Sequence, residues 1–133
     1  MLISRANTAD LVGAVAYVWE TPQNLVLPDK LWRFEWADPK VVEPLYIWGL
    51  LRARAMRRHL SALSSGTGGS MKNISKRKLL GMPIPWPKYR DQQRFARAVR
   101  AVREVRSQVS SGLEEDLMAS LQRRAFAGQL DRM

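Results

Sequence analysis

The chain has 133 residues, enough for one domain with an appendage, and 46% of them are apolar, which suffices for a modest core. Lys and Arg number 22 against 12 Asp and Glu, so the net charge of +10 predicts a polyanionic partner, nucleic acid before an acidic membrane. The absence of cysteine excludes disulfides, thiol nucleophiles and Cys-ligated metals, and the single histidine, His59, excludes a multi-histidine metal site.

The first part of the sequence predicts short strands joined by turns. Residues 2–4 form the first strand candidate. Residues 12–19 are apolar at both alternating sets of positions, which predicts a central strand covered on both faces. In residues 31–36 the three aromatic residues share one face and the two charged residues share the other. We expect the aromatic face in the core; a base-stacking platform is the alternative.

A helix is predicted to follow these strands. Pro44 offers a start, and apolar residues recur at helical spacing over residues 45–63. A Gly/Ser-rich loop covers residues 64–70, and Ser75 is placed to cap a brief helical turn. The prolines within residues 83–87 keep the next stretch extended, because each disfavours helix for the residue before it.

Residues 89–128 predict one long helix or two collinear ones. A helix of this length exceeds the width of a small domain, so its apolar stripe requires a partner helix. The poor helix formers at residues 110–112 mark the place of a possible break. Eight residues form the stripe and are the expected helix-pairing residues: Phe95, Val99, Val102, Val105, Val109, Leu113, Leu117 and Leu121.

The sequence gives little support for catalysis. His59 lies on a basic helical segment, where a solvated side chain is expected, and the acids show no paired spacing. The glycine-rich residues 66–70 have neither the lysine of a phosphate-binding loop nor the glycine spacing of a dinucleotide site. We therefore expect a protein without catalytic residues, metal or cofactor.

Positive charge is concentrated between Gly49 and Lys78, where eight Lys or Arg occur without any acid. Such a segment can replace the counterions of a phosphate backbone, which makes binding salt-dependent. The amide of Asn73 can also pair with adenine through two hydrogen bonds. A solvated cationic helix followed by a flexible linker explains the same composition, and composition alone does not separate the two interpretations.

Several segments resemble, in the same order, parts of the specificity subunits of type I restriction–modification systems. Residues 2–7 (LISRAN) and 12–16 (VGAVA) resemble the middle of the target recognition domain of that family. Residues 72–75 (KNIS) and 79–87 (LLGMPIPWP) resemble the end of that domain.

The long helix of the family has counterparts as well. Residues 91–95 (DQQRF) resemble its start, with Asp91 in place of the usual glutamate. Residues 117–121 (LMASL) and 124–130 (RAFAGQL) are similar to its end. The resemblance thus covers essentially the whole chain.

The resemblance implies an α+β fold: a small mixed α/β DNA-recognition domain over residues 1–88, followed by a long helix over residues 89–133 that forms an antiparallel coiled coil. Such subunits are not catalytic; they bind double-stranded DNA and scaffold adenine methyltransferase subunits, sometimes with a restriction subunit. A full-length subunit has two of each region, whereas this chain has at most one and lacks the usual first half of the recognition domain. We therefore expect a cytoplasmic homodimer, or pairing with another specificity chain.

Six residues are the expected DNA contacts: Lys72, Asn73, Lys76 and Arg77, with Ser4 and Arg5 in the opposite loop. One alternative is an assembly fragment that dimerises or docks on a methyltransferase without reading DNA. Another is a general RNA- or DNA-binding protein unrelated to restriction. No membrane contact is expected, since the longest apolar run, residues 11–19, is shorter than the roughly 20 residues that a bilayer requires.

Overall fold

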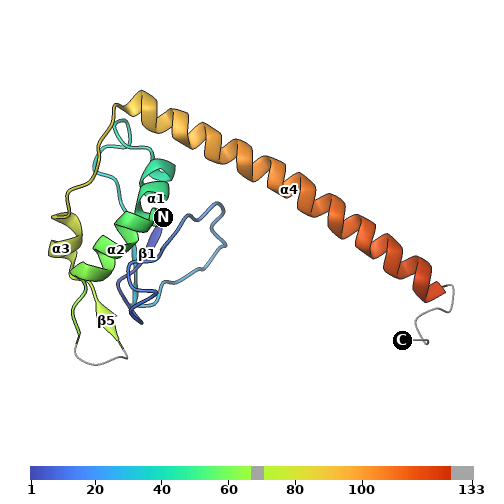
Figure 1. Cartoon of the computed structure of the whole chain (residues 1–133), viewed down its shortest axis with the longest axis horizontal. Coiled ribbons are helices and arrows are strands. Elements are labelled where there is room, and N and C mark those ends of the chain that lie inside the picture. Colours follow the sequence, from blue (N-terminus) through green and yellow to red (C-terminus); the bar gives the residue numbers. More distant parts are fainter. Residues whose placement is uncertain (67–70, 127–133) are drawn as a thin grey trace. The chain divides into compact units, whose positions relative to one another are not determined.

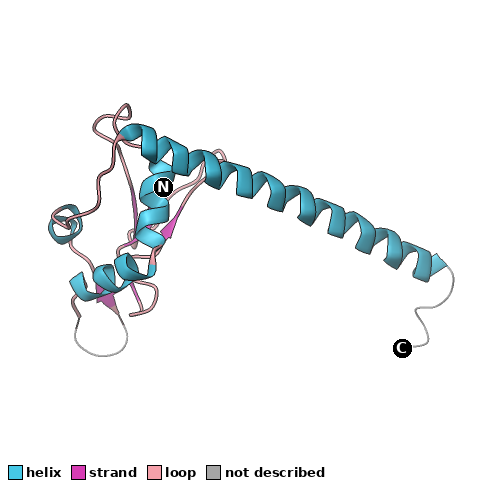
Figure 2. Cartoon of the chain, turned by 45° about the horizontal axis from the view of Figure 1, so that its top comes forward, coloured by secondary structure: helices cyan, strands magenta, loops and turns pink. Residues whose placement is uncertain are grey.

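The structure is a computed structural model, which describes residues 1–66 and 71–126 of the chain. The side chains of residue 111, of residues 114–118 and of residues 120–126 also lie outside the described part. The chain divides into two compact units, Met1–Ala96 and Arg97–Met133. The predicted α+β class is confirmed, with small sheets and short helices in the first unit and a long C-terminal helix (Figure 1, Figure 2).

The first sheet has three short antiparallel strands in the order β3-β1-β4. The central strand is β1 (Leu2–Ser4), and the edges are β3 (Val15–Ala16) and β4 (Leu31–Arg33). Ile3 of β1 faces Trp32 of β4, and its side chain is almost completely buried. The strand predicted over residues 2–4 is therefore confirmed, and it occupies the centre of the sheet.

The central strand predicted over residues 12–19 is wrong, because only Val15–Ala16 forms a strand and it lies at the sheet edge. The segment before it forms a turn, in which the backbone N–H of Val12 donates to the carbonyl of Thr8. Gly13 continues this turn with a φ of +73°, a value that favours glycine because it has no Cβ. The apolar run thus buries Val12 in the core without extending the sheet.

The alternation predicted for residues 31–36 is confirmed. Arg33 and Glu35 are exposed and form an ion pair, whereas Trp32, Phe34 and Trp36 are partly buried. The rings of Phe34 and Trp36 stack with their centroids 5.6 Å apart and pack against the core. The aromatic face therefore extends past the end of β4 and covers one side of the hydrophobic core.

The single helix predicted over residues 45–63 is interrupted. Two helices, α1 (Pro44–Arg52) and α2 (Arg54–Leu63), are separated by Ala53, whose ψ of 139° is not helical. The guanidinium of Arg57 donates to two carbonyls in the turn before β3, at 3.1 and 2.8 Å, and so fixes α2 on that turn. The interruption lets each helix direct its own apolar side chains toward the same core.

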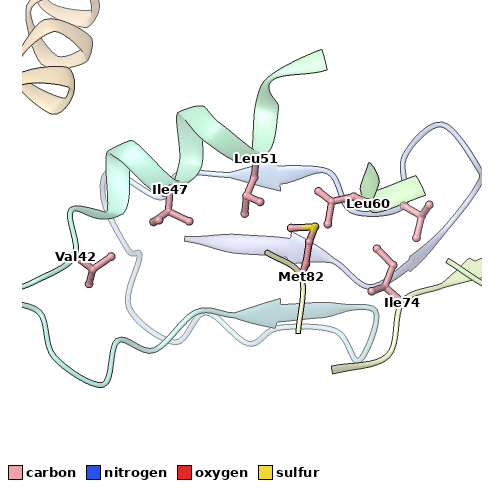
Figure 3. Close-up of a cluster of buried hydrophobic side chains, with 7 residues drawn as sticks. Val42, Ile47, Leu51, Leu60, Ile74 and Met82 are labelled. Atoms are coloured by element: carbon pink, nitrogen blue, oxygen red, sulfur yellow. The ribbon is translucent and has the colours of Figure 1, made fainter. Parts of the chain in front are cut away.

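The core of the first unit draws on residues far apart in the sequence. In Figure 3 the side chains of Ile47 and Leu51 point from α1 toward the strands. Ile74 contributes from the segment between β5 and α3, so this packing also fixes the position of both short elements. The buried cluster consists of Val12, Val42, Ile47, Leu51, Leu60, Ile74 and Met82.

A second, two-stranded sheet pairs β2 (Ala6–Asn7) with β5 (Lys72–Asn73). The short helix α3 (Lys76–Leu80) follows directly. As predicted, Ser75 caps it: the Ser75 hydroxyl accepts a hydrogen bond of 3.3 Å from the backbone N–H of Lys78. The β5–α3 segment is therefore held by strand pairing at one end and by a helix cap in its middle.

The last helix, α4 (Tyr89–Phe126), continues without interruption through residues 110–112. Its start belongs to the first unit, because Gln92 is fully buried there. Oε1 of Gln92 accepts from the backbone N–H of Glu43 at 3.0 Å, and its Nε2 donates to the carbonyl of Pro87 at 3.0 Å. The first turns of α4 therefore pack with the first unit, which ends at Ala96.

Candidate nucleic-acid interface

The two segments predicted to contact DNA are neighbours in the fold. In the β2–β5 pair, Ala6 lies opposite Asn73 and Asn7 lies opposite Lys72. The ladder extends by one bond, since the backbone N–H of Ile74 donates to the carbonyl of Arg5 at 2.9 Å. Antiparallel pairing thus brings residues 5–7 directly beside residues 72–74.

Arg5 is positioned by the segment before β4. Its Nε donates to the backbone carbonyl of Asp29 at 2.6 Å, and its guanidinium lies 3.4 Å from the Asp29 carboxylate. The guanidinium also lies 5.7 Å from the centre of the Trp32 ring, within the range of a cation–π interaction. The Asp29 side chain is largely exposed, so its attraction for Arg5 is weakened by solvent.

Lys76 approaches the same ring from a different element. It is the first residue of α3, directly after the capping Ser75, and its side chain is exposed. Its ammonium group lies 5.5 Å from the centre of the Trp32 ring. Trp32 therefore has two cationic side chains beside it, one from β1–β2 and one from α3.

The remaining predicted contacts are also at this surface. Lys72 Nζ donates to the carbonyl of Gly66 at 3.1 Å, and because an ammonium has three donors, this bond leaves two for a phosphate. Asn73 and Arg77 are exposed. Lys78, which is not among the predicted contacts, donates to the carbonyl of Leu63 at 3.2 Å. On the surface formed by β5 and α3, the exposed Lys76 and Arg77 thus direct positive charge at solvent, whereas Lys72 and Lys78 also bind backbone carbonyls.

Ser4 occupies a different position from the other five residues. It is buried, and its hydroxyl accepts a hydrogen bond of 3.2 Å from the side-chain amide of Asn7. Together with Asn7, Lys30 and Leu31 it lines a pocket of about 350 Å³. Ser4 is therefore placed to orient Asn7 rather than to reach a duplex itself, and no local pattern of charge or spacing singles out Asn7.

Other cations of the acid-free segment have structural contacts. Arg57 is bonded to the turn before β3, as described above, and Arg52 stacks on Trp48 with its guanidinium 4.5 Å from the ring centre. The basic segment is therefore divided: these two arginines hold α1 and α2 in place, while the positive charge near β5 and α3 faces solvent.

The described residues give no support to a metal site or a membrane span. Among the side chains that the structure describes, no three His, Asp or Glu are grouped closely enough to hold a metal ion. In the same part of the chain, no helix is both long enough and apolar enough to cross a bilayer.

Four residues of the predicted helix-pairing stripe are exposed on α4. Val102, Val105, Val109 and Leu113 are 57% to 69% exposed, and Val99 is partly buried. The side chains of the last two predicted members, Leu117 and Leu121, lie outside the described residues. Exposed aliphatic residues at this spacing are typical of a helix that packs on a partner.

Phe95 differs from the rest of the stripe. Its ring stands edge-on to Tyr46 of α1, with the centroids 5.9 Å apart. It also packs on Gly49 so closely that a Cβ at that position would lie 2.4 Å from the Phe95 ring. The Phe95 ring therefore packs partly in the first unit and remains 40% exposed.

Comparison with known proteins adds no relative, since no family model, no curated protein and no solved structure matches this chain.

Proposed function

We propose that the chain is a DNA-recognition module like those of type I specificity subunits, and that the surface formed by β5 and α3 contacts double-stranded DNA. The observation that carries this proposal is the β2–β5 pairing, which gathers Arg5, Lys72 and Lys76 from separate parts of the chain. Side chains at such a surface can contact phosphates, while Asn73 supplies an exposed amide for a base edge. In this proposal the module itself is not catalytic.

The second part of the proposal concerns assembly. The exposed stripe of α4 favours pairing with a second helix, from another copy of this chain or from a different specificity chain. Antiparallel pairing would hold two recognition modules, and adenine methyltransferase subunits, with or without a restriction subunit, would dock on this cytoplasmic scaffold.

The test of DNA binding uses the full chain and a labelled duplex of mixed sequence, titrated at several salt concentrations. We expect the Lys72→Ala/Lys76→Ala double variant to bind more weakly. The negative slope of log affinity against log salt should become shallower by roughly 1.8, since each lost phosphate contact removes about 0.9 from its magnitude. Unchanged affinity and slope would contradict the proposed surface.

The matched control removes the same charge elsewhere. Arg54 and Arg58 are exposed residues of α2. If net charge alone drives binding, Arg54→Ala/Arg58→Ala will weaken binding as much as the lysine double variant. If the β5–α3 surface is the interface, the arginine variant will keep most of the affinity and of the salt slope.

A second candidate function follows from the exposed stripe: the chain could act as an assembly fragment that pairs through α4 without reading DNA. β3 and β4 are edge strands of the described sheet, and the unpaired backbone groups of an edge strand can pair with another chain. Sedimentation with and without a duplex separates the two functions. A dimer whose sedimentation does not change on addition of DNA supports the assembly fragment and contradicts the first proposal.

A further inference from the structure

Within the proposed DNA interface, we propose that Arg5 and Lys76 form a paired clamp on neighbouring backbone phosphates, and that Trp32 is the positioning residue that holds both cations. This inference rests on the proposed function. It goes beyond it by assigning a role to an aromatic residue that the sequence places on a core face.

The geometry of one ring carries the inference. The Arg5 guanidinium and the Lys76 ammonium lie 5.7 and 5.5 Å from the centre of the same indole. The two charges can therefore be no farther apart than the sum of these distances, although 70 residues separate them in sequence. Trp32 is itself fixed, because it pairs with the buried Ile3 across β1 and β4.

Two like charges at this separation repel each other, and the indole opposes that repulsion. Tryptophan has the strongest cation–π interaction of the aromatic side chains, so it stabilises both cations in positions they would otherwise leave. A phosphate backbone then meets two charges whose side chains have already lost part of their freedom. The gain in affinity comes from this preorganisation, as the ring need not touch the DNA.

The clamp includes a competing acid. The Asp29 carboxylate lies 3.4 Å from the Arg5 guanidinium and is 82% exposed, so it competes with a phosphate for this cation. Arg5 does not depend on this carboxylate for its position, because the Asp29 backbone carbonyl also binds its Nε at 2.6 Å. Removing the charge of Asp29 should therefore strengthen DNA binding.

The experiment measures duplex affinity of the full chain and of Trp32→Leu, Trp32→Phe and Asp29→Asn. We expect Trp32→Leu to bind about 3- to 10-fold more weakly, the loss expected when two cation–π interactions disappear. Trp32→Phe should restore most of the affinity, because it keeps an aromatic face. Asp29→Asn should bind about twofold more tightly, with the largest gain at low salt.

A second background shows whether Trp32 acts through the cations. In Arg5→Ala/Lys76→Ala, the further change Trp32→Leu should have less than about a twofold effect, because no cation remains to be positioned. A loss of the same size in both backgrounds would overturn the inference and assign Trp32 a structural role. Far-ultraviolet circular dichroism checks that each variant is folded, and Asp29→Asn tests the clamp independently if Trp32→Leu is not.

The outcomes separate this inference from the proposed function. A wild-type chain that does not bind DNA overturns both. A wild-type chain that binds with a steep salt slope, while Trp32→Leu binds equally well, overturns only the clamp. Inorganic phosphate, compared with chloride at equal ionic strength, supplies the last arm: it should displace the duplex from the wild-type chain more strongly than from Lys76→Ala, and equal displacement from both would contradict the clamp.

Discussion

The two units of the chain differ in whether they contain a buried apolar core. In Met1–Ala96, the seven side chains of the core cluster converge and are at most 8% exposed, although Val26 and Leu80 of the same unit are 85% and 79% exposed. From Arg97 onward, the described aliphatic side chains of α4 include four that are more than half exposed. The first unit therefore has its own source of stability, whereas the second depends on helix propensity and on whatever covers its stripe.

This difference also separates two kinds of functional surface. A surface on the first unit, such as β5 with α3, is held by strand pairing, a helix cap and the core beneath it. The stripe on the second unit is held by its helix alone, so its energy of interaction becomes available only on association. Substitutions in the stripe should change association without unfolding the first unit. Substitutions in the core should destabilise the first unit without changing the association of α4.

The largest expected effect comes from placing charge in the stripe. Val105→Asp/Val109→Asp would bury two unpaired carboxylates in a helix–helix contact, so we expect self-association to weaken at least about 100-fold. Sedimentation equilibrium of the full chain measures this directly, and circular dichroism should show that the helix persists. A wild-type chain that stays monomeric at all concentrations would contradict helix pairing with a second copy.

The matched control for the stripe is Gln108→Asp. Gln108 lies about 100° around the helix from the middle of the stripe, and its side-chain amide donates to Glu104 at 3.3 Å. Loss of this exposed bond should cost only a few tenths of a kcal/mol, about 0.2–0.5 for such a pair. If this variant disrupts association as strongly as the valine changes do, the pairing surface is not the stripe.

The next effect tests where the first unit ends. Gln92→Leu would leave the buried N–H of Glu43 and the carbonyl of Pro87 without their partner, which should destabilise the first unit by about 2–4 kcal/mol. Urea unfolding monitored by tryptophan fluorescence gives the change. Gln93→Leu is the neighbouring control at a partly exposed position and should have little effect. Equal effects of the two would mean that α4 joins the core less firmly than these bonds indicate.

The same substitution, glycine to alanine, should destabilise the first unit and stabilise the second. Gly49→Ala places a Cβ 2.4 Å from the Phe95 ring, so the helix and the ring must move apart, at a cost of about 1–3 kcal/mol. Gly112→Ala meets nothing within 4 Å and should stabilise α4 by about 1 kcal/mol, because alanine is the better helix former. Urea midpoints report the first change and helix content the second. A loss of stability in both variants would show that another group packs on Gly112.

The parts of the fold that follow from local chemistry could be predicted from the sequence. The strand at residues 2–4, the Ser75 cap and the length of α4 depend on neighbours within a few positions. The turn at Gly13 and the break at Ala53 could not be predicted, because the packing of α2 on this turn joins distant segments, with Arg57 bonded to carbonyls more than 40 residues away.

The candidate site also has features that the sequence predicts and features that it does not. The basic residues of the β5–α3 segment are evident from charge alone, and four of the six predicted contacts lie there. Their alignment with Arg5, the burial of Ser4 and the place of Trp32 between Arg5 and Lys76 all follow from strand pairing between distant segments. Such pairing is decided by the core beneath the strands, which no local pattern of charge or polarity reveals.

The smallest expected effect concerns Tyr46, which joins α1 to the proline-rich stretch. Its hydroxyl donates to the carbonyl of Pro85 at 3.1 Å, and burial raises the pKa of Tyr46 above its usual value of 10.0. Because the bond is exposed, Tyr46→Phe should cost only about 0.5 kcal/mol at neutral pH.

From pH 10 upward the folded state holds the proton of the Tyr46 hydroxyl more tightly than the unfolded state does, so the free energy of unfolding should fall as pH rises toward the folded pKa. The Phe variant has no such proton, so its stability should fall less over that range, and urea midpoints at pH 7, 9 and 10.5 measure the difference. Tyr89→Phe should keep the wild-type dependence of the unfolding free energy on pH, because it leaves the Tyr46 hydroxyl in place. If Tyr89→Phe removes this dependence instead, another group causes it, and the Tyr46 hydroxyl contributes less to stability than its contacts indicate.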